Sequence, residues 1–343
     1  MKTTAQEPEA PQKSRKSSGN SSKQLATTVV PQQALQIKNI LVPLDFSRAS
    51  MQVLDYATAL AKQFDAQIHL AHIQKPDEAC EVPGAGHLMR ECAESVSFLH
   101  DRLVGIHPQR GPQFWPENCH IRTGHAYQEI CDLARELNTD LIVIASRGNT
   151  GLKRMVLGST AERVVRLSPC PVLVVRQRKR KGRVDVGLAI ANRKVSIRNI
   201  LVPVDFSPCS MAGAMYAAFL AKALDAKLRL FHAFQPPPPV VVDRASASIS
   251  SMQDLNLKNA RLDMEAFSKL DFLSNVKCDT ELRTGYPVDQ ICGETKGADV
   301  DLVVISTHGH SGFDRMLLGS VAEHVVRYAE CPVLVVPSRC STS

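Results

Sequence analysis

Two copies of one short pattern have the residue types of an anion-binding site. The sequence reads RMVLGSTAERVVR over Arg154–Arg166 and RMLLGSVAEHVVR over Arg315–Arg327, with ten identical positions. In each copy a Gly-Ser pair, Gly158-Ser159 or Gly319-Ser320, precedes a Val-Val helical pattern. The N-terminus of a helix offers unpaired backbone N–H groups and a positive dipole end, which together favour a bound phosphate.

The same residues also fit a purely structural role. Ser159 with Glu162, and Ser320 with Glu323, have the spacing of a capping box, in which the serine hydroxyl accepts from the helix backbone. Both interpretations stay open for these serines. They conflict only if the cap uses the hydroxyl fully.

A glycine-containing loop and an acidic residue accompany each Gly-Ser pair. Glycines allow a backbone to approach phosphate oxygens closely, and a carboxylate accepts hydrogen bonds from ribose hydroxyls or an adenine amine. These residues are Asp45, Ser146, Arg147, Gly148 and Gly151 in the first copy, and Asp205, Thr307, His308, Gly309 and Gly312 in the second. Neither loop has the GxxxxGK[ST] or GxGxxG pattern, which excludes a Walker P-loop and a nicotinamide fingerprint. The structural alternatives are that Asp45 is a turn or helix-cap residue and that the glycines only form turns.

The elements that must position these residues alternate between strand and helix. In the first half we expect strands at Ile40–Leu44, Gln67–Ile73, Cys119–Arg122, Leu141–Ala145 and Val172–Val175, and helices at Val53–Phe64, His87–Val104, Tyr127–Leu137 and Thr160–Leu167. The second half repeats this order. For example, NILVPLDFS at Asn39–Ser47 returns as NILVPVDFS at Asn199–Ser207. The run of prolines that ends at Pro239 excludes a regular helix there.

This pattern predicts an α/β fold. Apolar strands that alternate with helices form a parallel sheet covered on both faces. We expect two tandem doubly wound domains, each with a five-stranded parallel sheet in the order 3-2-1-4-5 flanked by helices. That order reverses direction between strands 1 and 4, and ligands bind outside the carboxyl ends of strands at such a point. The acid and the glycine loop should therefore face each other across one crevice in each half.

Length and charge set the domain organisation. The 343 residues suit two domains of ordinary size. We expect a disordered tail at 1–36, domain 1 at 37–176, a basic linker at 177–196, domain 2 at 197–337 and a C-terminal tail at 338–343. The net charge of +7 comes from the N-terminal tail and the connector. Its run RQRKRKGR, Arg176–Arg183, suits a solvated linker better than a nucleic-acid or lipid contact, because no aromatic residues interleave with the basic ones.

The composition also indicates a cellular compartment. The sequence holds 10 cysteines but no CxxC pair, and many of them lie in apolar runs as small hydrophobes. No apolar run is long enough to span a membrane, and the first residues have no apolar core typical of a secretory signal. We expect a cytoplasmic protein with reduced thiols.

Both halves resemble universal stress protein domains. That family is marked by an early strand that ends in Pro-x-Asp, here Pro43 to Asp45 and Pro203 to Asp205. It is also marked by a late signature of Gly, two residues, Gly, nine residues, then Gly and Ser or Thr. Nine residues separate Gly148 from Gly158-Ser159, and nine separate Gly309 from Gly319-Ser320. The resemblance covers about residues 37–176 and 197–337 and implies a domain of the adenine nucleotide α-hydrolase-like type.

The resemblance also implies a ligand and its contacts. A subset of the family binds ATP, with Mg²⁺ at the phosphates, and ADP or AMP are related ligands. The adenosine contacts would be Pro43, Asp45 and the backbone of Ile73 in the first half, and Pro203, Asp205 and Ala233 in the second. The phosphate contacts would be Ala145, Gly148, Gly158, Ser159 and Thr160, and Ser306, Gly309, Gly319, Ser320 and Val321.

Two departures from the family pattern bear on which half binds better. Ala145 and Ser306 replace the first signature glycine, and a Cβ there narrows the backbone approach. The second half keeps a Gly-x-Pro turn that ends at Pro287, whereas the first half has Ala126 at that position. We therefore expect the second half to be the better site. Domains of this kind resemble pairs that dimerise through the last strand. We therefore expect Val172–Val175 to pair with Val333–Val336 within one chain, with further pairing into a homodimer of tandem chains as an extension.

Three functions remain in competition. The first is a stress-response regulatory protein that binds ATP with little or no catalysis, which fits the lack of a repeated general base or nucleophile. The second is a slow ATPase, for which His308 or Arg147 near the phosphates would be the feature to seek. The third is a nucleotide-free interaction module. No catalytic residue and no protein metal ligand is assigned, and His72 and His232 are expected to be structural.

Overall fold

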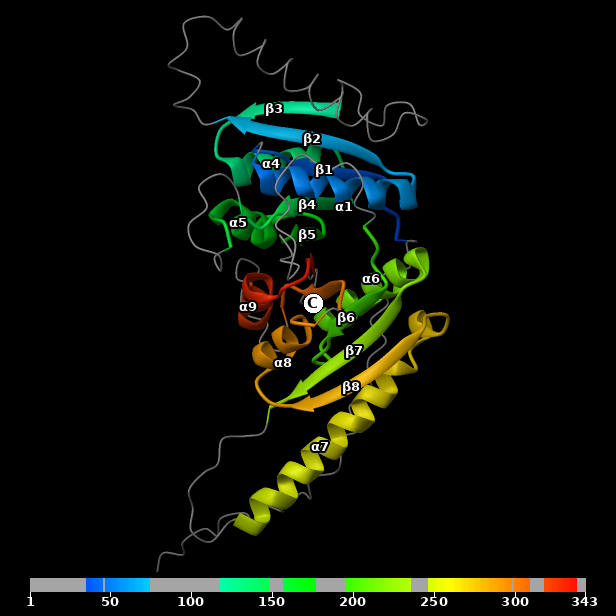
Figure 1. Ribbon diagram of the computed structural model, residues 1–343. Helices are drawn as coiled ribbons and strands as arrows, with labels where there is room; N and C mark the ends of the chain where they lie inside the picture. The colour runs from blue at the N-terminus through cyan, green and yellow to red at the C-terminus, as the bar shows by residue number, and fades with distance from the viewer. Residues whose placement is uncertain are drawn as a thin grey trace, which may run out of the picture. The chain divides into compact units, whose positions relative to one another are not determined.

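The first half contains five strands and the helices that connect them (Figure 1). The computed structural model describes residues 35–45, 47–74, 118–147, 157–176, 195–235, 246–297, 299–308 and 318–337, all within one compact unit, Ala34–Ser343. The elements of the first half are β1 (Asn39–Pro43), α1 (Arg48–Phe64), β2 (Gln67–Gln74), β3 (Cys119–Thr123), α4 (Ala126–Glu136), β4 (Leu141–Ala145), α5 (Ser159–Leu167) and β5 (Val172–Val175). The helix expected at His87–Val104 lies outside the described residues.

The second half repeats this order. Its elements are β6 (Asn199–Pro203), α6 (Pro208–Leu224), β7 (Lys227–Phe234), α7 (Ser246–Ser268), a 3₁₀ turn (Asp271–Leu273), β8 (Cys278–Thr284), α8 (Pro287–Glu294), β9 (Leu302–Ser306), α9 (Ser320–Tyr328) and β10 (Val333–Val336). The strands β4 and β9 are buried along their whole length, as their unbroken apolar sequences predict.

The strand order confirms the expected α/β topology. The sheet runs β3-β2-β1-β4-β5-β10-β9-β6-β7-β8, so each half has the order 3-2-1-4-5. All pairs within a half are parallel. The pair between β5 and β10 is antiparallel, with Leu173 opposite Leu334. Both halves therefore contribute to one sheet of ten strands.

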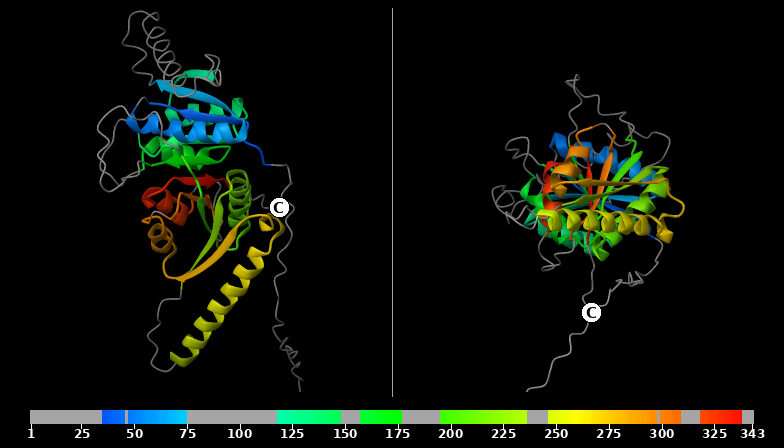
Figure 2. Two further views of the ribbon diagram at one scale, coloured as in Figure 1. Left: turned by 45° about the vertical axis from the view of Figure 1, so that its right-hand side comes forward. Right: turned by 90° about the horizontal axis from the view of Figure 1, so that it is seen from below.

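Helices cover both faces of this sheet, and a hydrophobic cluster fills the space beneath each layer (Figure 2). One cluster packs α1, α6 and α7 on the sheet, and the other packs α4, α5, α8 and α9. Alternate residues of a strand enter opposite clusters: Ile40 and Val42 belong to the first, and Leu41 to the second. Each cluster contains side chains from both halves of the chain.

Serine caps fix the start of the helix that follows the first strand of each half. The Ser47 hydroxyl accepts from the backbone N–H of Ser50 at 3.1 Å, and the Ser207 hydroxyl accepts from that of Ser210 at 3.1 Å. These bonds satisfy backbone donors that the first turn of a helix leaves open. Each helix ends at an aspartate in the left-handed conformation, Asp65 with φ of 53° and Asp225 with φ of 48°. The serine N-caps therefore determine where the chain leaves the carboxyl edge of the sheet.

Candidate functional site

The point of strand-order reversal brings two chain segments together in each half. Strand β1 pairs with β4 through Leu41 and Ile142, and β6 pairs with β9 through Leu201 and Val303. The strands of each pair are parallel, so their carboxyl ends lie at the same edge of the sheet. The residues after β1 and after β4 are therefore neighbours in space, as the sequence predicts.

A short turn holds the aspartate at this edge. In the first half the backbone N–H of Ser47 donates to Oδ1 of Asp45 at 3.0 Å. In the second half Oδ1 of Asp205 accepts from the backbone N–H of Ser207 at 3.0 Å and from its hydroxyl at 2.5 Å. Asp45 is thus a turn residue, as its structural interpretation has it, and Asp205 forms the equivalent turn. The turn also fixes each carboxylate at the end of the first strand.

An unusual backbone conformation completes the turn in the second half. Phe206 has a φ of 63°, in the left-handed region that aromatic residues rarely adopt. Its ring lies 4.6 Å from the ring of His232 and 6.1 Å from that of Phe267, measured between centroids. These ring contacts stabilise the strained residue and hold Asp205 beside it in place.

The two strand-end histidines are structural, as expected. The Nδ1 atom of His72 lies 2.8 Å from the carbonyl oxygen of Leu44, and that of His232 lies 2.7 Å from the carbonyl oxygen of Val204. Because a carbonyl only accepts, each imidazole carries its proton on Nδ1. The histidines therefore join the second strand of each half to the segment that leads to the aspartate.

The helix on the other side of the edge begins at a glycine rather than a serine. Gly158 is the N-cap of α5 and Gly319 is the N-cap of α9, so neither N-cap residue has a side chain that could make a capping hydrogen bond. Ser159 and Ser320 are the first helical residues and are exposed. The capping-box interpretation is therefore wrong, because each serine lies one residue too far along the chain to be the N-cap.

Each N-cap glycine packs closely against the loop after the preceding strand. The Gly158 N–H donates to the carbonyl of Ser146, and the Gly319 N–H donates to the carbonyl of Thr307, each at 2.8 Å. A Cβ at Gly319 would lie 3.0 Å from the Thr307 oxygen, and one at Gly158 would lie 3.4 Å from the Ser146 oxygen. The glycine is thus required by close contact in the second half and less strictly in the first.

The first signature position differs between the halves. In the second half the Ser306 hydroxyl donates to the carbonyl of His308 at 3.0 Å, so it supports the loop backbone. Gly213 of α6 packs against Ser306, since a Cβ added at Gly213 would lie 3.4 Å from the Ser306 backbone nitrogen. The corresponding residues of the first half are Ala145 and Val53. The first half therefore has an alanine and a valine at these two positions, whereas the second half has a serine and a glycine.

Most predicted site residues lie at this edge. Pro43 and Pro203 end β1 and β6, and Ile73 and Ala233 lie near the ends of β2 and β7, which flank those strands. Thr160 and Val321 are the second residues of α5 and α9. Gly148, Gly151, Gly309 and Gly312 lie outside the described residues.

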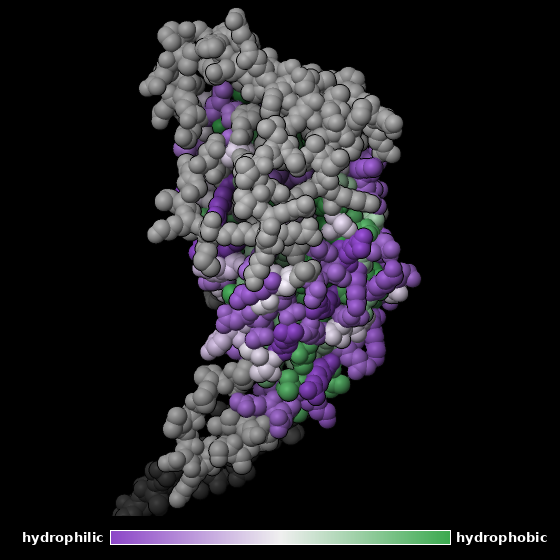
Figure 3. Space-filling model, in the orientation of Figure 1, coloured by the Kyte–Doolittle hydropathy of each residue, from purple (hydrophilic) through white to green (hydrophobic). Residues whose placement is uncertain are grey.

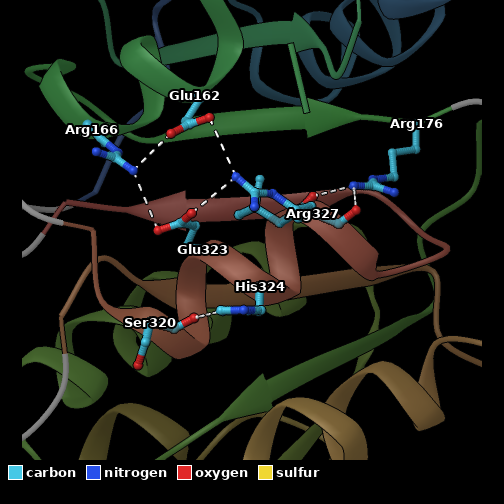
Figure 4. A network of polar contacts seen from close by, with 8 residues as sticks. Glu162, Arg166, Arg176, Ser320, Glu323, His324 and Arg327 are labelled. Atoms are coloured by element: carbon cyan, nitrogen blue, oxygen red, sulfur yellow. Dashed lines mark hydrogen bonds and ion pairs between the residues drawn. The ribbon is translucent and has the colours of Figure 1, made fainter. Parts of the chain in front are cut away.

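An ion-pair network between α5 and α9 was missed by sequence reasoning (Figure 4). Arg166 lies 2.8 Å from Glu162 and 3.5 Å from Glu323, while Arg327 lies 3.1 Å from Glu323 and 3.7 Å from Glu162. The spacing within each helix could have predicted the pairs inside a helix. The pairs between helices depend on the tertiary arrangement. Glu162 and Glu323 thus serve this network instead of a capping box.

Arg176, at the end of β5, adds a second link to the same helix. Its guanidinium donates to the carbonyl of Val326 at 2.6 Å and to the carbonyl of Arg327. These carbonyls lie in the last turn of α9, where the helix leaves acceptors open and the dipole favours a cation. Burial lowers the pKa of this guanidinium, with a further lowering from the nearby charge of Arg147.

Two buried thiols and the distribution of metal-binding side chains describe the chemistry of the remaining residues. Burial raises the pKa of the Cys131 thiol to about 11 and that of Cys170 to about 12, so neither is a thiolate near neutral pH. Within the described ranges, no group of three or more His, Cys, Asp or Glu side chains could hold a metal ion. The same residues include no helix long and apolar enough to cross a bilayer.

A surface cavity of about 430 Å³ lies away from this edge. Its lining includes Asn199 and Lys227, which begin β6 and β7, and Val300, which precedes β9. The cavity is therefore at the amino ends of the second half's strands. Its arginine, Arg229, is paired with Glu281 at 3.1 Å and with Glu294 at 2.8 Å.

Comparison with known proteins identifies relatives of both halves. A model of the universal stress protein family matches residues 36–176 and 196–337. Universal stress protein MJ0531 of Methanocaldococcus jannaschii is 33% identical over 147 residues, which cover 43% of this chain and 86% of the relative. A universal stress protein of Mycolicibacterium smegmatis is 25% identical over 316 residues, covering 88% of this chain and 97% of the relative. The crystal structure of a universal stress protein from Archaeoglobus fulgidus has the same fold, with a TM-score of 0.57 at 19% identity over 87% of this chain and 98% of that one.

Proposed function

This chain belongs to the universal stress protein family, and from that premise we propose that it is a stress-response regulatory protein that binds ATP at the carboxyl edge of each half, with little or no catalysis. The adenine ring and ribose would lie beside Pro43, Asp45 and Ile73, or Pro203, Asp205 and Ala233. The phosphates would lie at the N-termini of α5 and α9.

The observation that carries this proposal is the open start of these two helices. With Gly158 and Gly319 as N-caps, the N-cap residues of α5 and α9 supply no side chain to the first backbone N–H groups, which a phosphate would then accept from. The exposed hydroxyls of Ser159 and Ser320 stand at the same place. A carboxylate held at the end of the neighbouring strand supplies an acceptor for the sugar or base.

A magnesium ion fits this arrangement only through the phosphates. Mg²⁺ retains several waters and binds nucleotides through phosphate oxygens and one or two carboxylates. Since the described residues form no cluster of three metal-binding side chains, the ion would enter with the nucleotide. ADP and AMP would occupy the same edge with fewer phosphate contacts.

His308 favours the second half as the stronger site. Its Nδ1 atom lies 3.0 Å from the Thr307 hydroxyl, and its buried Nε2 atom has no hydrogen-bond partner among the described residues. A buried polar atom without a partner is costly, and a phosphate oxygen would satisfy it. The same histidine is the feature that favours slow ATP hydrolysis as a second candidate function.

Replacing the first helical serine with aspartate tests the binding proposal. Asp stabilises a helix N-terminus through the dipole but repels a phosphate at the same place. We expect Ser320→Asp to lose the second-half site and Ser159→Asp the first, with the thermal midpoint unchanged or raised. Isothermal titration with ATP measures both sites, and Ser159→Ala and Ser320→Ala are matched controls that remove only the hydroxyl. Unchanged ATP affinity in the double aspartate variant would refute the site.

Mass spectrometry separates the three candidate functions. The protein is purified natively and then denatured, and the released small molecules are identified. Released ATP supports storage without turnover, and ADP or AMP supports slow hydrolysis. The nucleotide-free interaction module is supported if no nucleotide is released and added ATP does not bind.

We further propose that the two domains act as an intramolecular pair and that the protein works in the cytoplasm. The antiparallel pairing of β5 with β10 and the ion pairs between α5 and α9 support the first statement. Reduced thiols among the described residues support the second, because a reducing compartment keeps cysteines from forming disulfides. Examples are Cys131, Cys170, Cys278 and Cys292.

A further inference from the structure

Helix α7 has two different apolar faces. Its inner face packs on β7 and β8 through Ala260, Met264 and Phe267, which are 7%, 4% and 1% exposed. On the far side of the helix, Leu255 and Leu262 are 56% and 54% exposed and are the most exposed leucines of the described residues. Figures 1 and 2 show α7 lying beside β8 and continuing beyond it.

The outward residues follow a coiled-coil spacing. Leu255, Asn259, Leu262 and Ala266, named the outer stripe here, are separated by four, three and four residues, and all four are exposed. This places the leucines at d positions and Asn259 and Ala266 at a positions of a heptad. Figure 3 shows that the described surface on one face is mostly hydrophilic with small hydrophobic patches.

Charges flank the outer stripe in a self-complementary way. Lys258, just before Asn259, is at a g position, and Asp263, just after Leu262, is at an e position. In a parallel two-stranded coiled coil, a g residue faces the e residue five positions later on the other helix. Lys258 of each copy therefore meets Asp263 of the other, which gives two opposite-charge pairs around the twofold axis.

Asn259 selects the same arrangement. In a parallel pair, residues at a positions face each other, so the two Asn259 amides can hydrogen-bond across the axis. An antiparallel pair would place each asparagine opposite a leucine and leave its amide without a partner in the interface. The asparagine lowers stability in any arrangement, but least in the parallel one in register, where the two amides satisfy each other.

We propose that the outer stripe of α7 binds the outer stripe of a second copy of this chain, as a parallel coiled coil in register. The inner face of each helix stays on its own sheet, so pairing requires no rearrangement of the domain. The inference does not rest on nucleotide binding, because the outer stripe includes none of the residues assigned to that site.

Charge reversal tests both the partner and the register. We expect the wild-type protein to show a reversible monomer–dimer equilibrium in sedimentation equilibrium over a concentration series. Lys258→Glu or Asp263→Lys alone should weaken the dimer about tenfold, because each converts attraction into repulsion at two contacts. The double variant Lys258→Glu, Asp263→Lys should restore wild-type affinity, since the exchanged charges again meet.

A leucine substitution tests the apolar contact itself. Leu262→Glu should leave a monomer with an unchanged thermal midpoint, because the side chain is exposed within its own chain. Leu35→Glu, at another exposed leucine, is the matched control and should dimerise as the wild type does. A wild type that stays monomeric at every concentration, or a dimer insensitive to Leu262→Glu, overturns the proposal. A double charge variant no tighter than the single variants overturns the parallel register.

Discussion

Replacing Tyr216 with phenylalanine should stabilise the protein. Tyr216 of α6 is 6% exposed, and its hydroxyl has no hydrogen-bond partner among the described residues. Burial raises the pKa of this phenol, and the nearby Cys170 and Asp140 of the first domain raise it further. Its ring packs edge-on against Phe219, 5.9 Å between centroids, and Phe219 stacks on Phe64 of α1 at 5.4 Å. The hydroxyl is therefore buried where the two domains meet.

The size of the effect follows from this burial. A buried hydroxyl without a partner loses its hydrogen bonds to water and gains none in the protein, which costs about 1–3 kcal/mol. Tyr216→Phe removes that cost and keeps the ring contacts. We expect the free energy of unfolding to rise by about 1 kcal/mol, which corresponds to about 2–4 °C in the thermal midpoint for a unit of this size.

Urea unfolding followed by circular dichroism measures the change. Tyr56, at the corresponding place in α1, is only half-buried, so Tyr56→Phe is the matched control and should give no gain. A Tyr216→Phe variant no more stable than the wild type would refute the reasoning, and with it the burial of α6 between the domains. An equal gain from Tyr56→Phe would show that the hydroxyl's surroundings are not the cause.

Three further predictions concern the edge of the sheet and the ionisable groups. Gly319→Ala should lower the free energy of unfolding by about 1–3 kcal/mol, because its Cβ would lie 3.0 Å from a carbonyl oxygen. Gly158→Ala, at 3.4 Å, should cost less in the same thermal scan, and equal losses would contradict the difference in packing. The ring nitrogens of His69 and His120 lie 3.3 Å apart, and burial lowers the pKa of both from 6.5. Since the folded state favours the neutral rings, their contribution to the free energy of unfolding should be complete above pH 6.5 and decrease as the pH drops below it. A thermal midpoint equally pH-dependent in wild type and His69→Gln would disprove this. Cys131 and Cys170, with pKa values raised to about 11 and about 12, should resist Ellman's reagent at neutral pH until urea is added, and labelling of either in the native protein would contradict their burial.

The sequence was sufficient to predict the order and topology of the sheet. Apolar runs such as Leu141–Ala145 are visible because a strand buried on both faces needs no polar residue. The repeat allowed each strand and helix to be predicted from two separate segments of the sequence. The order 3-2-1-4-5 is a common one for five parallel strands that alternate with helices on both faces of a sheet.

The starts of α5 and α9 could not be predicted to the residue. Ser159 and Glu162 have the spacing of a capping box, but the close contact of Gly158 with the Ser146 carbonyl moves the cap back by one residue. That contact depends on how the helix packs against the loop after β4. Helix ends are set by such tertiary contacts, which local spacing does not contain.

The pairing of the last strands of the two halves was expected, but the side-chain contacts between α5 and α9 were beyond the sequence. The spacing of Glu162 with Arg166 predicts a pair within one helix, but nothing in the chain order shows that Glu323 lies 3.5 Å from Arg166. The nucleotide contacts and the domain boundaries remain predictions. For the phosphate loop this is because Gly148 and Gly309 lie outside the described residues.

The joining of both halves in one chain has a consequence for how this protein can evolve. In a symmetric homodimer every substitution appears in both subunits, so the two sites must change together. Here Val53 and Ala145 occupy one half, while Gly213 and Ser306 occupy the corresponding positions of the other. In a single chain, a substitution in one half leaves the other half unchanged. One crevice can therefore alter its chemistry while the other keeps its own.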